Sequence, residues 1–397
     1  MLVLVVVLVR RGHLTRRLGR LGHGDGGDAV LCRRAHERAG RPKDEDGGHR
    51  GGLGVQQERQ KLCEHASSSI PVHGLNARTS GALLASRYIR RVFRQTRARW
   101  AVLFVGTLVL GLAVYLGISF RVAESVTRVD RLPLEPPATA IAPTHEDVSF
   151  ASRDGLLLRG WWFAVPGADR AVVVVHGRGR NRVNSTFHPA EIARMLLGHH
   201  YSVLLFDLRG HGESEGTRYT LGIEEPRDVL AAIDETAAKA RIDRRRVAII
   251  GESLGGGSAL MTVKADPTIG PVVTDSAFAD GNTVVSESAT RYTNLPAWFT
   301  PGIVLTSRVF LGLDLGEVKP AQVVAAHPER AFLFIQCTSD DTVPAHHGTD
   351  LKAASANPRT ELWSVEGCNH VQAYVTHPAE WEEHVIGFLE RELDRLP

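Results

Sequence analysis

Hydrophobic and polar positions follow an alternating pattern from residue 146 onward, where short β-branched runs are separated by stretches with helical apolar spacing. The predicted strands are 147–152, 156–164, 171–175, 202–206, 247–250, 272–274, 332–335 and 361–364. The first two flank Asp154-Gly155, a hairpin turn signal, and the clearest helices are predicted over 224–238 and 381–393. Such alternation predicts an α/β fold, with a mostly parallel central sheet and helices on both faces.

A different pattern occupies residues 101–120, where twenty consecutive residues carry no charge. At 1.5 Å per residue this length matches a hydrocarbon core of about 30 Å, which predicts one transmembrane helix. A buried core helix seldom stays uncharged all round for this length, and the apolar region of a cleaved signal peptide is shorter, about 7 to 15 residues.

Charge on either side of this stretch predicts its orientation. The basic juxtamembrane segment 86–100 holds six arginines, and the fifteen residues after the stretch hold three. The positive-inside rule then predicts a single-pass protein of the cell membrane with a cytoplasmic N-terminus and an extracytoplasmic C-terminal domain.

The segments around this helix lack the pattern of a folded core. Residues 1–87 contain no Phe, Tyr or Trp, and the first 60 hold 11 Arg and 12 Gly, so we expect residues 1–85 to be a disordered basic extension. The apolar run 1–9 is too short to span a bilayer. Residues 121–145, with prolines at 133, 136, 137 and 143, are predicted to be an extended linker.

Composition narrows the class of partner. Residues 1–140 hold 23 Lys and Arg against 11 Asp and Glu, whereas residues 141–397 hold 24 against 33. The acidic larger part argues against a nucleic-acid partner. The four cysteines form neither a disulfide framework nor a paired C-x-x-C zinc motif, and we predict no metal and no cofactor.

A candidate nucleophile lies where a predicted strand meets a predicted helix. Residues 247–250 run into Gly251-Glu252-Ser253-Leu254-Gly255, a G-x-S-x-G pattern, and the helix begins near Leu254. A sharp turn from strand to helix strains the serine and leaves room only for glycine neighbours. Ser253 is therefore the candidate nucleophile, and a glycine-rich helix start is the alternative.

A serine hydroxyl is a poor nucleophile at neutral pH, so it needs a base and an orienting carboxylate, expected in the order Ser, Asp, His. The predicted strand ending near residue 336 is followed by Asp340 and Asp341, either of which could be the acid, and Asp275 is a rival at another strand end. His370 follows the last predicted strand and is the candidate base. A solvated loop histidine is the alternative.

Catalysis also requires donors to the developing oxyanion. One is predicted to be the backbone N–H of Leu254, and the other that of Arg178 in the His-Gly-Arg-Gly loop at 176–179. The side chains of Arg178, Arg180 and Arg182 could favour an anionic substrate group, or the loop could simply be solvated.

Over residues 146–395 these motifs resemble the α/β-hydrolase superfamily. The matching pieces are FASRDGLLLRGWW at 150–162, His-Gly at 176–177, LFDLRGHGESEG at 205–216, GESLG at 251–255, the D-x-x-V-P spacing from Asp340, and His370. Within the superfamily the chain is similar to the membrane-anchored Bem46-like serine hydrolases and the serine aminopeptidase-like hydrolases. The D-x-x-V-P spacing of that group implies Asp340 rather than Asp341, and a serine nucleophile argues against epoxide hydrolase or dehalogenase chemistry.

The sequence departs from the resemblance in two places. Arg178 and Gly179 follow His-Gly where relatives often carry Asn or an apolar residue, and the long N-terminal extension has no counterpart. The resemblance also implies a cap, here at about 283–324, in an insertion after the sixth strand. Its apolar residues suggest an acyl or otherwise greasy substrate, or they pack the cap onto the sheet.

Cys337 and Cys368 precede the candidate acid and base by three and two residues, on strands expected to be neighbours. If the domain is exported, a disulfide between them would brace both loops.

These observations predict that residues 146–397 form an α/β-hydrolase domain with a Ser253, His370, Asp340 triad. The expected function is that of a membrane-anchored serine hydrolase that cleaves carboxylic ester bonds of a small-molecule or lipid acyl substrate, thioesters included, through an acyl-enzyme. A peptidase, amidase or acyltransferase would use the same triad, and a non-catalytic extracytoplasmic binding domain is the remaining class. The sequence does not give the oligomeric state.

The start of the chain carries a hypothesis of its own. No methionine follows Met1 until Met195, and about the first 80 residues lack the composition of folded protein. Translation would then begin at an alternative codon just upstream of the apolar stretch, and the extension would be a gene-model artefact. Mass spectrometry of the natively expressed protein tests this hypothesis, since peptides from residues 11–59 would contradict it.

Overall fold

A computed structural model of the chain describes residues 77–396. The chain divides into two units between Arg91 and Val92, and the description below concerns the second unit and the helix that leads into it. Most of the predicted disordered extension lies outside the described residues. Residues 77–85, predicted to be disordered, are helical instead, and they are rich in Ala and Leu, which favour helix.

Helix α4 (Ala77–Thr127) contains the uncharged stretch 101–120 and continues seven residues beyond it. By length and composition, the part Ala85–Thr127 can cross a membrane. Many of its apolar side chains, among them Leu103, Phe104 and Leu110, are more than half exposed within the chain. Such a face needs an apolar surrounding, as expected for a candidate membrane span.

The segment after α4 differs from the predicted extended tether. Residues 121–127 belong to α4, and a short 3-10 helix, η2 (Ala138–Ala140), follows Pro137. Ala138 and Ile141 are buried against Trp161 and Phe163 of the domain. The segment docks because its few apolar residues find a tertiary partner, which proline content alone does not reveal.

The central sheet has eight strands in the order β1-β2-β4-β3-β5-β6-β7-β8. The pairs β1·β2 and β2·β4 are antiparallel and all other neighbours are parallel, so the predicted mostly parallel sheet is confirmed. The strands are β1 (Glu146–Ala151), β2 (Leu157–Phe163), β3 (Ala171–Val175), β4 (Ser202–Phe206), β5 (Val247–Glu252), β6 (Val272–Asp275), β7 (Phe332–Cys337) and β8 (Glu361–Val365).

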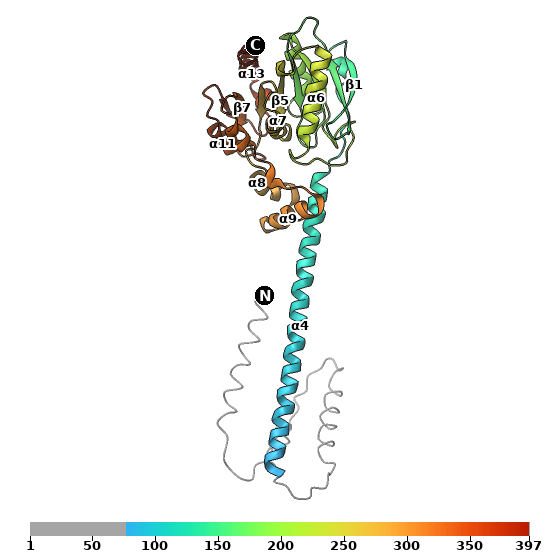
Figure 1. The fold of residues 1–397 in the computed structure, drawn as a ribbon, viewed down its shortest axis with the longest axis vertical. Coiled ribbons are helices and arrows are strands. Elements are labelled where there is room, and N and C mark those ends of the chain that lie inside the picture. Colours follow the sequence, from blue (N-terminus) through green and yellow to red (C-terminus); the bar gives the residue numbers. More distant parts are fainter. Residues whose placement is uncertain (1–76, 397) are drawn as a thin grey trace, which may run out of the picture. The chain divides into compact units, whose positions relative to one another are not determined.

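Helices cover both faces of this sheet, as predicted (Figure 1). Alternate residues of β3 point to opposite faces, so that Val173 packs with one apolar layer and Val172 with the other. The first layer contains α6 (Glu225–Ala240), α7 (Leu254–Ala265), α10 (Pro320–Ala326) and α11 (His346–Ala354). The second contains α5 (Pro189–Gly198) and α13 (Pro378–Leu393), with α12 (Ala373–Thr376) just before α13, and η3 (Arg244–Arg246) leads into β5.

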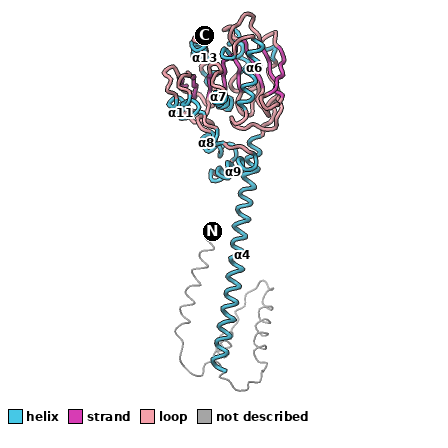
Figure 2. The backbone as a smooth tube through the Cα atoms, in the orientation of Figure 1, coloured by secondary structure: helices cyan, strands magenta, loops and turns pink. Residues whose placement is uncertain are grey.

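The insertion after β6 forms the cap. It consists of α8 (Gly281–Thr293), η4 (Ala297–Phe299), α9 (Thr300–Leu311) and η5 (Leu315–Glu317). Figure 2 shows α9 next to α4, with α8 close to α9, outside the layers that flank the strands. The predicted cap, 283–324, reached too far along the chain, because α10 packs on α7 and α11 and belongs to a flanking layer.

Candidate active site

The backbone at Ser253 is held in a strained conformation between β5 and α7. Its φ is 48° and its ψ is −114°. A Cβ at Gly255 would lie 2.2 Å from the Val175 carbonyl oxygen, and one at Gly251 would lie 2.6 Å from the Gly255 oxygen. Both positions therefore require glycine, and the chain turns sharply enough to present the serine at the carboxyl edge of the sheet.

Three side chains that are far apart in sequence meet at this edge. Ser253 follows β5, Asp340 follows β7 and His370 follows β8. His370 Nε2 lies 2.9 Å from Ser253 Oγ, and His370 Nδ1 lies 2.8 Å from Asp340 Oδ2. Because Nδ1 donates its proton to the carboxylate, Nε2 has a free lone pair and can accept the serine proton.

The two adjacent aspartates after β7 have different surroundings. Asp340 is buried, and its Oδ1 accepts hydrogen bonds from the backbone N–H groups of Thr342 and Val343 at 2.9 and 2.8 Å. Asp341 is exposed and pairs with Arg291 of α8 at 2.5 Å. Only Asp340 contacts the histidine.

The loop at 176–179 leaves one amide available. The N–H of Gly177 donates to Glu252 Oε1 at 2.6 Å, and that of Gly179 donates to His211 Nε2 at 3.1 Å. Between them, the N–H of Arg178 meets no acceptor among residues 77–396. The same holds for the N–H of Leu254, the first residue of α7, within the described part of the chain. Both residues border the same apolar pocket as Ser253.

Two buried histidines fix this loop, and sequence reasoning assigned neither a role. His176 Nε2 accepts a hydrogen bond from the Leu208 N–H, and His211 Nε2 accepts the one from Gly179. Burial lowers the pKa of His176 to about 4 and that of His211 to about 3, so both rings are neutral at pH 7. A neutral ring can accept with one nitrogen and donate with the other, which holds the loop rigidly.

The arginine side chains of the loop point in different directions. Arg178 donates to the Val126 carbonyl oxygen at the end of α4 at 3.2 Å. Arg182 is buried beside Asp207, so it is neither solvated nor free to meet a substrate. Arg180 lines the pocket that contains Ser253.

Two pockets meet at Ser253. A polar pocket of about 500 Å³ includes His370, Arg180 and Arg291, and an apolar pocket of about 100 Å³ lies under the cap. The apolar pocket is lined by Val126, Arg178, Tyr219, Leu221, Ser253, Leu254, Phe278, Val284, Val285, Ser288, Ala289, Tyr292, Thr293, Ile303, Thr342 and Val343. Ser253 thus lies between a polar pocket and an apolar pocket.

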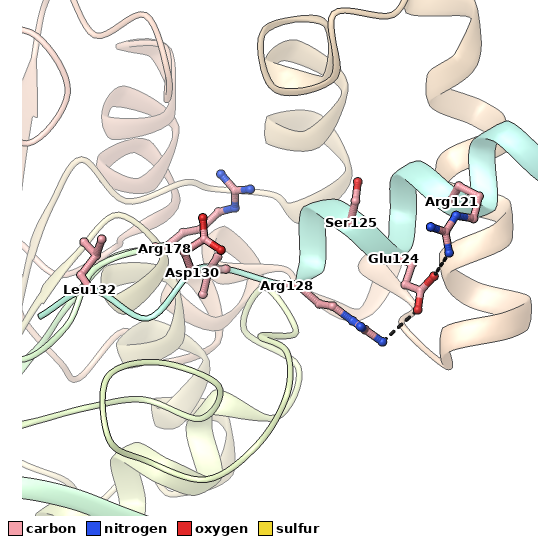
Figure 3. A pocket seen from close by; sticks show the side chains of 9 residues that line it. Arg121, Glu124, Ser125, Arg128, Asp130, Leu132 and Arg178 are labelled. Carbon is pink, nitrogen blue, oxygen red and sulfur yellow. Dashed lines mark hydrogen bonds and ion pairs between the residues drawn. The ribbon is translucent and has the colours of Figure 1, made fainter.

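A third pocket, of about 650 Å³, lies at the end of α4 and does not include Ser253 (Figure 3). Glu124 pairs there with Arg121 at 3.0 Å and with Arg128 at 2.9 Å. The lining holds three arginines against the two carboxylates of Glu124 and Asp130, so the groove keeps a small net positive charge.

Two buried carboxyl groups lie behind the serine. Glu252 Oε1 accepts from the Gly177 N–H and from Ser185 Oγ at 2.5 Å, and burial raises the pKa of Glu252. Asp275, the rival acid, accepts from Ser276 Oγ at 3.1 Å and does not hydrogen-bond to His370. Burial, together with the nearby Glu252 carboxyl, raises the pKa of Asp275 to about 7. The carboxylate that contacts His370 is that of Asp340, not that of Asp275.

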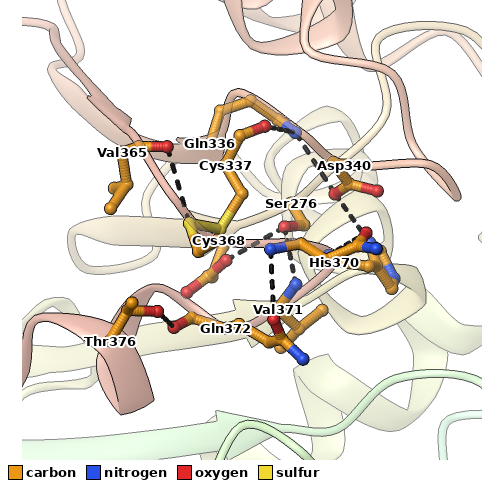
Figure 4. The surroundings of a disulfide bond; sticks show 12 residues. Ser276, Gln336, Cys337, Asp340, Val365, Cys368, His370, Val371, Gln372 and Thr376 are labelled. Atoms are coloured by element: carbon orange, nitrogen blue, oxygen red, sulfur yellow. Dashed lines mark hydrogen bonds and ion pairs between the residues drawn. A yellow bond between two sulfur atoms is a disulfide. The ribbon is translucent and has the colours of Figure 1, made fainter.

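Cys337 and Cys368 form the disulfide that we expected on the condition that the domain is exported (Figure 4). It joins the last residue of β7 to the loop after β8 and so links the two segments that carry Asp340 and His370. Nearby, the N–H of Val371 donates to Ser276 Oγ at 3.1 Å, which holds the histidine loop against the end of β6.

One group of potential metal ligands lies between α8 and α11, formed by Glu287, His346 and His347. His347 Nδ1 accepts a hydrogen bond from the Ala279 N–H, so the ring proton is on Nε2 and is donated to Glu287 at 3.0 Å. This nitrogen has no lone pair for a metal ion, and the group is better described as a tie between the cap and the domain.

Comparison with known proteins gives consistent matches. A family model described as "Alpha/beta hydrolase family" matches residues 172–383. Relatives include the uncharacterized protein YfhR of Salmonella typhi, 26% identical over 62% of this chain and 82% of its own length. The uncharacterized protein Rv2307c of Mycobacterium tuberculosis is 31% identical over 59% of this chain and 75% of its own. The solved structure of the Pyrococcus furiosus esterase Pf2001 has a TM-score of 0.56 and 22% identity, covering 68% of this chain and 98% of that one.

The disulfide should stabilise the domain. Closing a loop across a sequence separation of 31 residues contributes about 3 to 4 kcal/mol in the chain-entropy treatment. We expect the Cys337→Ser/Cys368→Ser variant to unfold at correspondingly lower denaturant concentration than the wild type, and to be insensitive to reductant. A Cys32→Ser/Cys63→Ser variant is the control and should behave as the wild type does. Modification of both Cys337 and Cys368 by a thiol reagent in the native protein without reductant would contradict the bond.

Asp275 should give stability a distinct pH dependence. Its pKa is about 7 in the folded chain, above the value of about 3.9 expected when unfolded, so its contribution is full below pH 4 and is lost as pH rises toward 7. As the pH rises from 4.5 to 7.5, the free energy of unfolding of the wild type should therefore fall by roughly 2 to 4 kcal/mol relative to that of Asp275→Asn. Denaturant unfolding at each pH measures this difference. Asp341→Asn, at an exposed carboxyl whose pKa Arg291 lowers, should show no such difference. Parallel curves for Asp275→Asn and wild type would exclude a raised pKa.

Proposed function

Because this chain belongs to the alpha/beta hydrolase family, we propose that it is a membrane-anchored serine hydrolase of carboxylic ester substrates. The observation that carries the proposal is the pair of contacts at His370, 2.9 Å to Ser253 Oγ and 2.8 Å to Asp340 Oδ2. A nucleophile, a base and an orienting acid in this geometry are the minimum machinery of acyl transfer through serine.

The first half of the proposed reaction forms an acyl-enzyme. Ser253 Oγ attacks the substrate carbonyl carbon while His370 Nε2 takes the hydroxyl proton, and Asp340 stabilises the imidazolium that results. The carbonyl oxygen becomes an oxyanion, which accepts hydrogen bonds from the N–H groups of Leu254 and Arg178. Collapse of this intermediate breaks the ester C–O bond, and His370 returns the proton to the leaving alcohol.

The second half releases the acid. A water molecule gives a proton to His370 Nε2 and attacks the acyl carbon, and the same two amides bind the second oxyanion. Its collapse frees the carboxylic acid and returns the proton to Ser253. An acceptor alcohol or amine in place of water would give acyl transfer, so the residues fit both outcomes.

The substrate class follows from the two pockets. The apolar pocket lies directly beside Ser253 and suits an acyl chain, whereas the polar pocket suits the leaving group. The fold neighbour from Pyrococcus furiosus is described as an esterase, which favours ester over amide substrates for this chain as well. Peptide hydrolysis is the second candidate because it needs the same three residues.

We place the catalytic domain outside the cytoplasm of a single-pass protein. The arginine excess before the uncharged part of α4 supports a cytoplasmic N-terminus. The Cys337–Cys368 disulfide supports an oxidising compartment for the domain, since such bonds are rare where thiols are kept reduced.

An active-site probe tests the proposal. A fluorophosphonate should label the full chain in detergent, and Ser253→Ala should abolish labelling and lower ester hydrolysis by at least about 10⁴-fold. Ser258→Ala is the matched control, because Ser258 lies in α7, the helix that follows Ser253, with its hydroxyl bonded to the Leu254 carbonyl oxygen. Nitrophenyl esters of increasing chain length, compared with aminoacyl nitroanilides, separate an esterase from a peptidase. Absence of labelling in the folded protein would favour a non-catalytic binding domain.

A further inference from the structure

The outer face of the cap is apolar and exposed. We define this cap face by Trp298, Leu305, Val309 and Phe310, which are 52–64% exposed. Leu305 and Val309 are four residues apart on α9 and so lie on one side of the helix. Soluble surfaces rarely keep so many large apolar side chains together, so the cap face requires a partner.

The cap face is positioned by α4. Tyr115 Oη accepts a hydrogen bond from the Gly302 N–H and donates one to the Trp298 carbonyl oxygen, both at 3.0 Å. A Cβ at Gly302 would lie 2.5 Å from Ser119 Oγ, so the two helices approach as closely as glycine allows. Phe310 packs edge-on against Phe120, with ring centroids 5.4 Å apart.

The position of these contacts along α4 fixes the depth of α9. The uncharged stretch 101–120 is bounded by Arg99 and Arg121, and its twenty residues match a hydrocarbon core of about 30 Å without slack. α9 contacts Tyr115 to Phe120, which is the last 9 Å or so of that stretch. If α4 spans the bilayer, α9 lies beside it at the level of one leaflet (Figures 1 and 2).

We propose that the cap face is seated in the lipid bilayer, so that α9 is a second, shallow membrane contact beside α4. The inference rests on the proposed membrane span and serine hydrolase function. The cap face is continuous with the apolar side chains of α4 through the Phe120–Phe310 and Tyr115–Trp298 ring contacts. That continuity favours lipid over a second copy of the chain or another protein.

The seated cap also defines where the substrate comes from. The apolar pocket beside Ser253 is walled by Val284 of α8, Ile303 of α9 and Val126 of α4, the three elements nearest the bilayer. A substrate acyl chain therefore reaches the serine from the lipid side. The substrate class is an acyl ester resident in the bilayer, not a freely dissolved ester.

Photocrosslinking of the full chain in phosphatidylcholine vesicles tests the seating. Val309→p-benzoylphenylalanine should form an adduct with the mass of one lipid on irradiation. Val375→p-benzoylphenylalanine is the matched control, since Val375 is 52% exposed but lies on α12, next to α13. Lipid adducts at 309 and none at 375 are expected. A crosslinked dimer, a protein adduct or no adduct at 309 would overturn the proposal.

A charge on the cap face gives a second, functional test. Leu305→Asp/Val309→Asp should lower hydrolysis of a long-chain ester embedded in vesicles by about tenfold or more, because carboxylates are expelled from the bilayer. Fluorophosphonate labelling and hydrolysis of a short soluble ester should stay unchanged, and Val375→Asp should leave all three readouts unchanged. Equal loss on the soluble ester, or no loss on the embedded one, would overturn the proposal. If the fluorophosphonate does not label the folded wild type, the proposed hydrolase function is wrong. The photocrosslinks at residue 309 still test whether the cap face lies in the bilayer.

Discussion

The close approach of α7 to β3 determines the geometry of the whole site. Gly255 lies so near the Val175 carbonyl oxygen that no side chain fits, and this proximity forces the backbone of Ser253 into a positive φ. Strain of this kind persists only where the surroundings over-determine it. Here β3 and β5 are buried on both faces between two apolar layers, so the serine cannot relax away from the carboxyl edge of the sheet.

Much of the fold could be predicted because buried parallel strands give a plain signal in sequence. All eight strands lie within two residues of their predicted bounds. The inner strands β3 to β7 are apolar runs covered on both faces, which need no polar alternation, and the turn signal Asp154-Gly155 marks the hairpin of β1 and β2. The docking of residues 128–145 could not be predicted, because the burial of Ile141 depends on Trp161 and Phe163, which β2 brings into place. Composition describes a segment, whereas docking depends on what lies beside it.

In the candidate site, too, some residues could be predicted from the sequence and others could not. Ser253 and His370 could be found because each directly follows a strand, and parallel strands end at one edge. Asp340 and Asp341 are indistinguishable by that criterion, and only the D-x-x-V-P resemblance favoured Asp340. In the structure, the backbone amides of the turn after Asp340 bind its carboxylate and distinguish it from Asp341. Glu252 occupies a position of the G-x-S-x-G pattern that any residue can fill, so its bond to Gly177 carried no sequence signal.

Arg178 contributes its backbone to one part of the molecule and its side chain to another. Its backbone borders the pocket of Ser253, while the guanidinium bonds to the last turn of α4 and lies over the rings of Tyr219 and Tyr292. Every amino acid except proline has the same N–H, so oxyanion binding places almost no demand on the side chain at this position. The arginine can therefore be chosen for its side-chain contacts with α4, Tyr219 and Tyr292. Mutagenesis can separate the two roles: Arg178→Ala removes these side-chain contacts and keeps the N–H, whereas proline removes both.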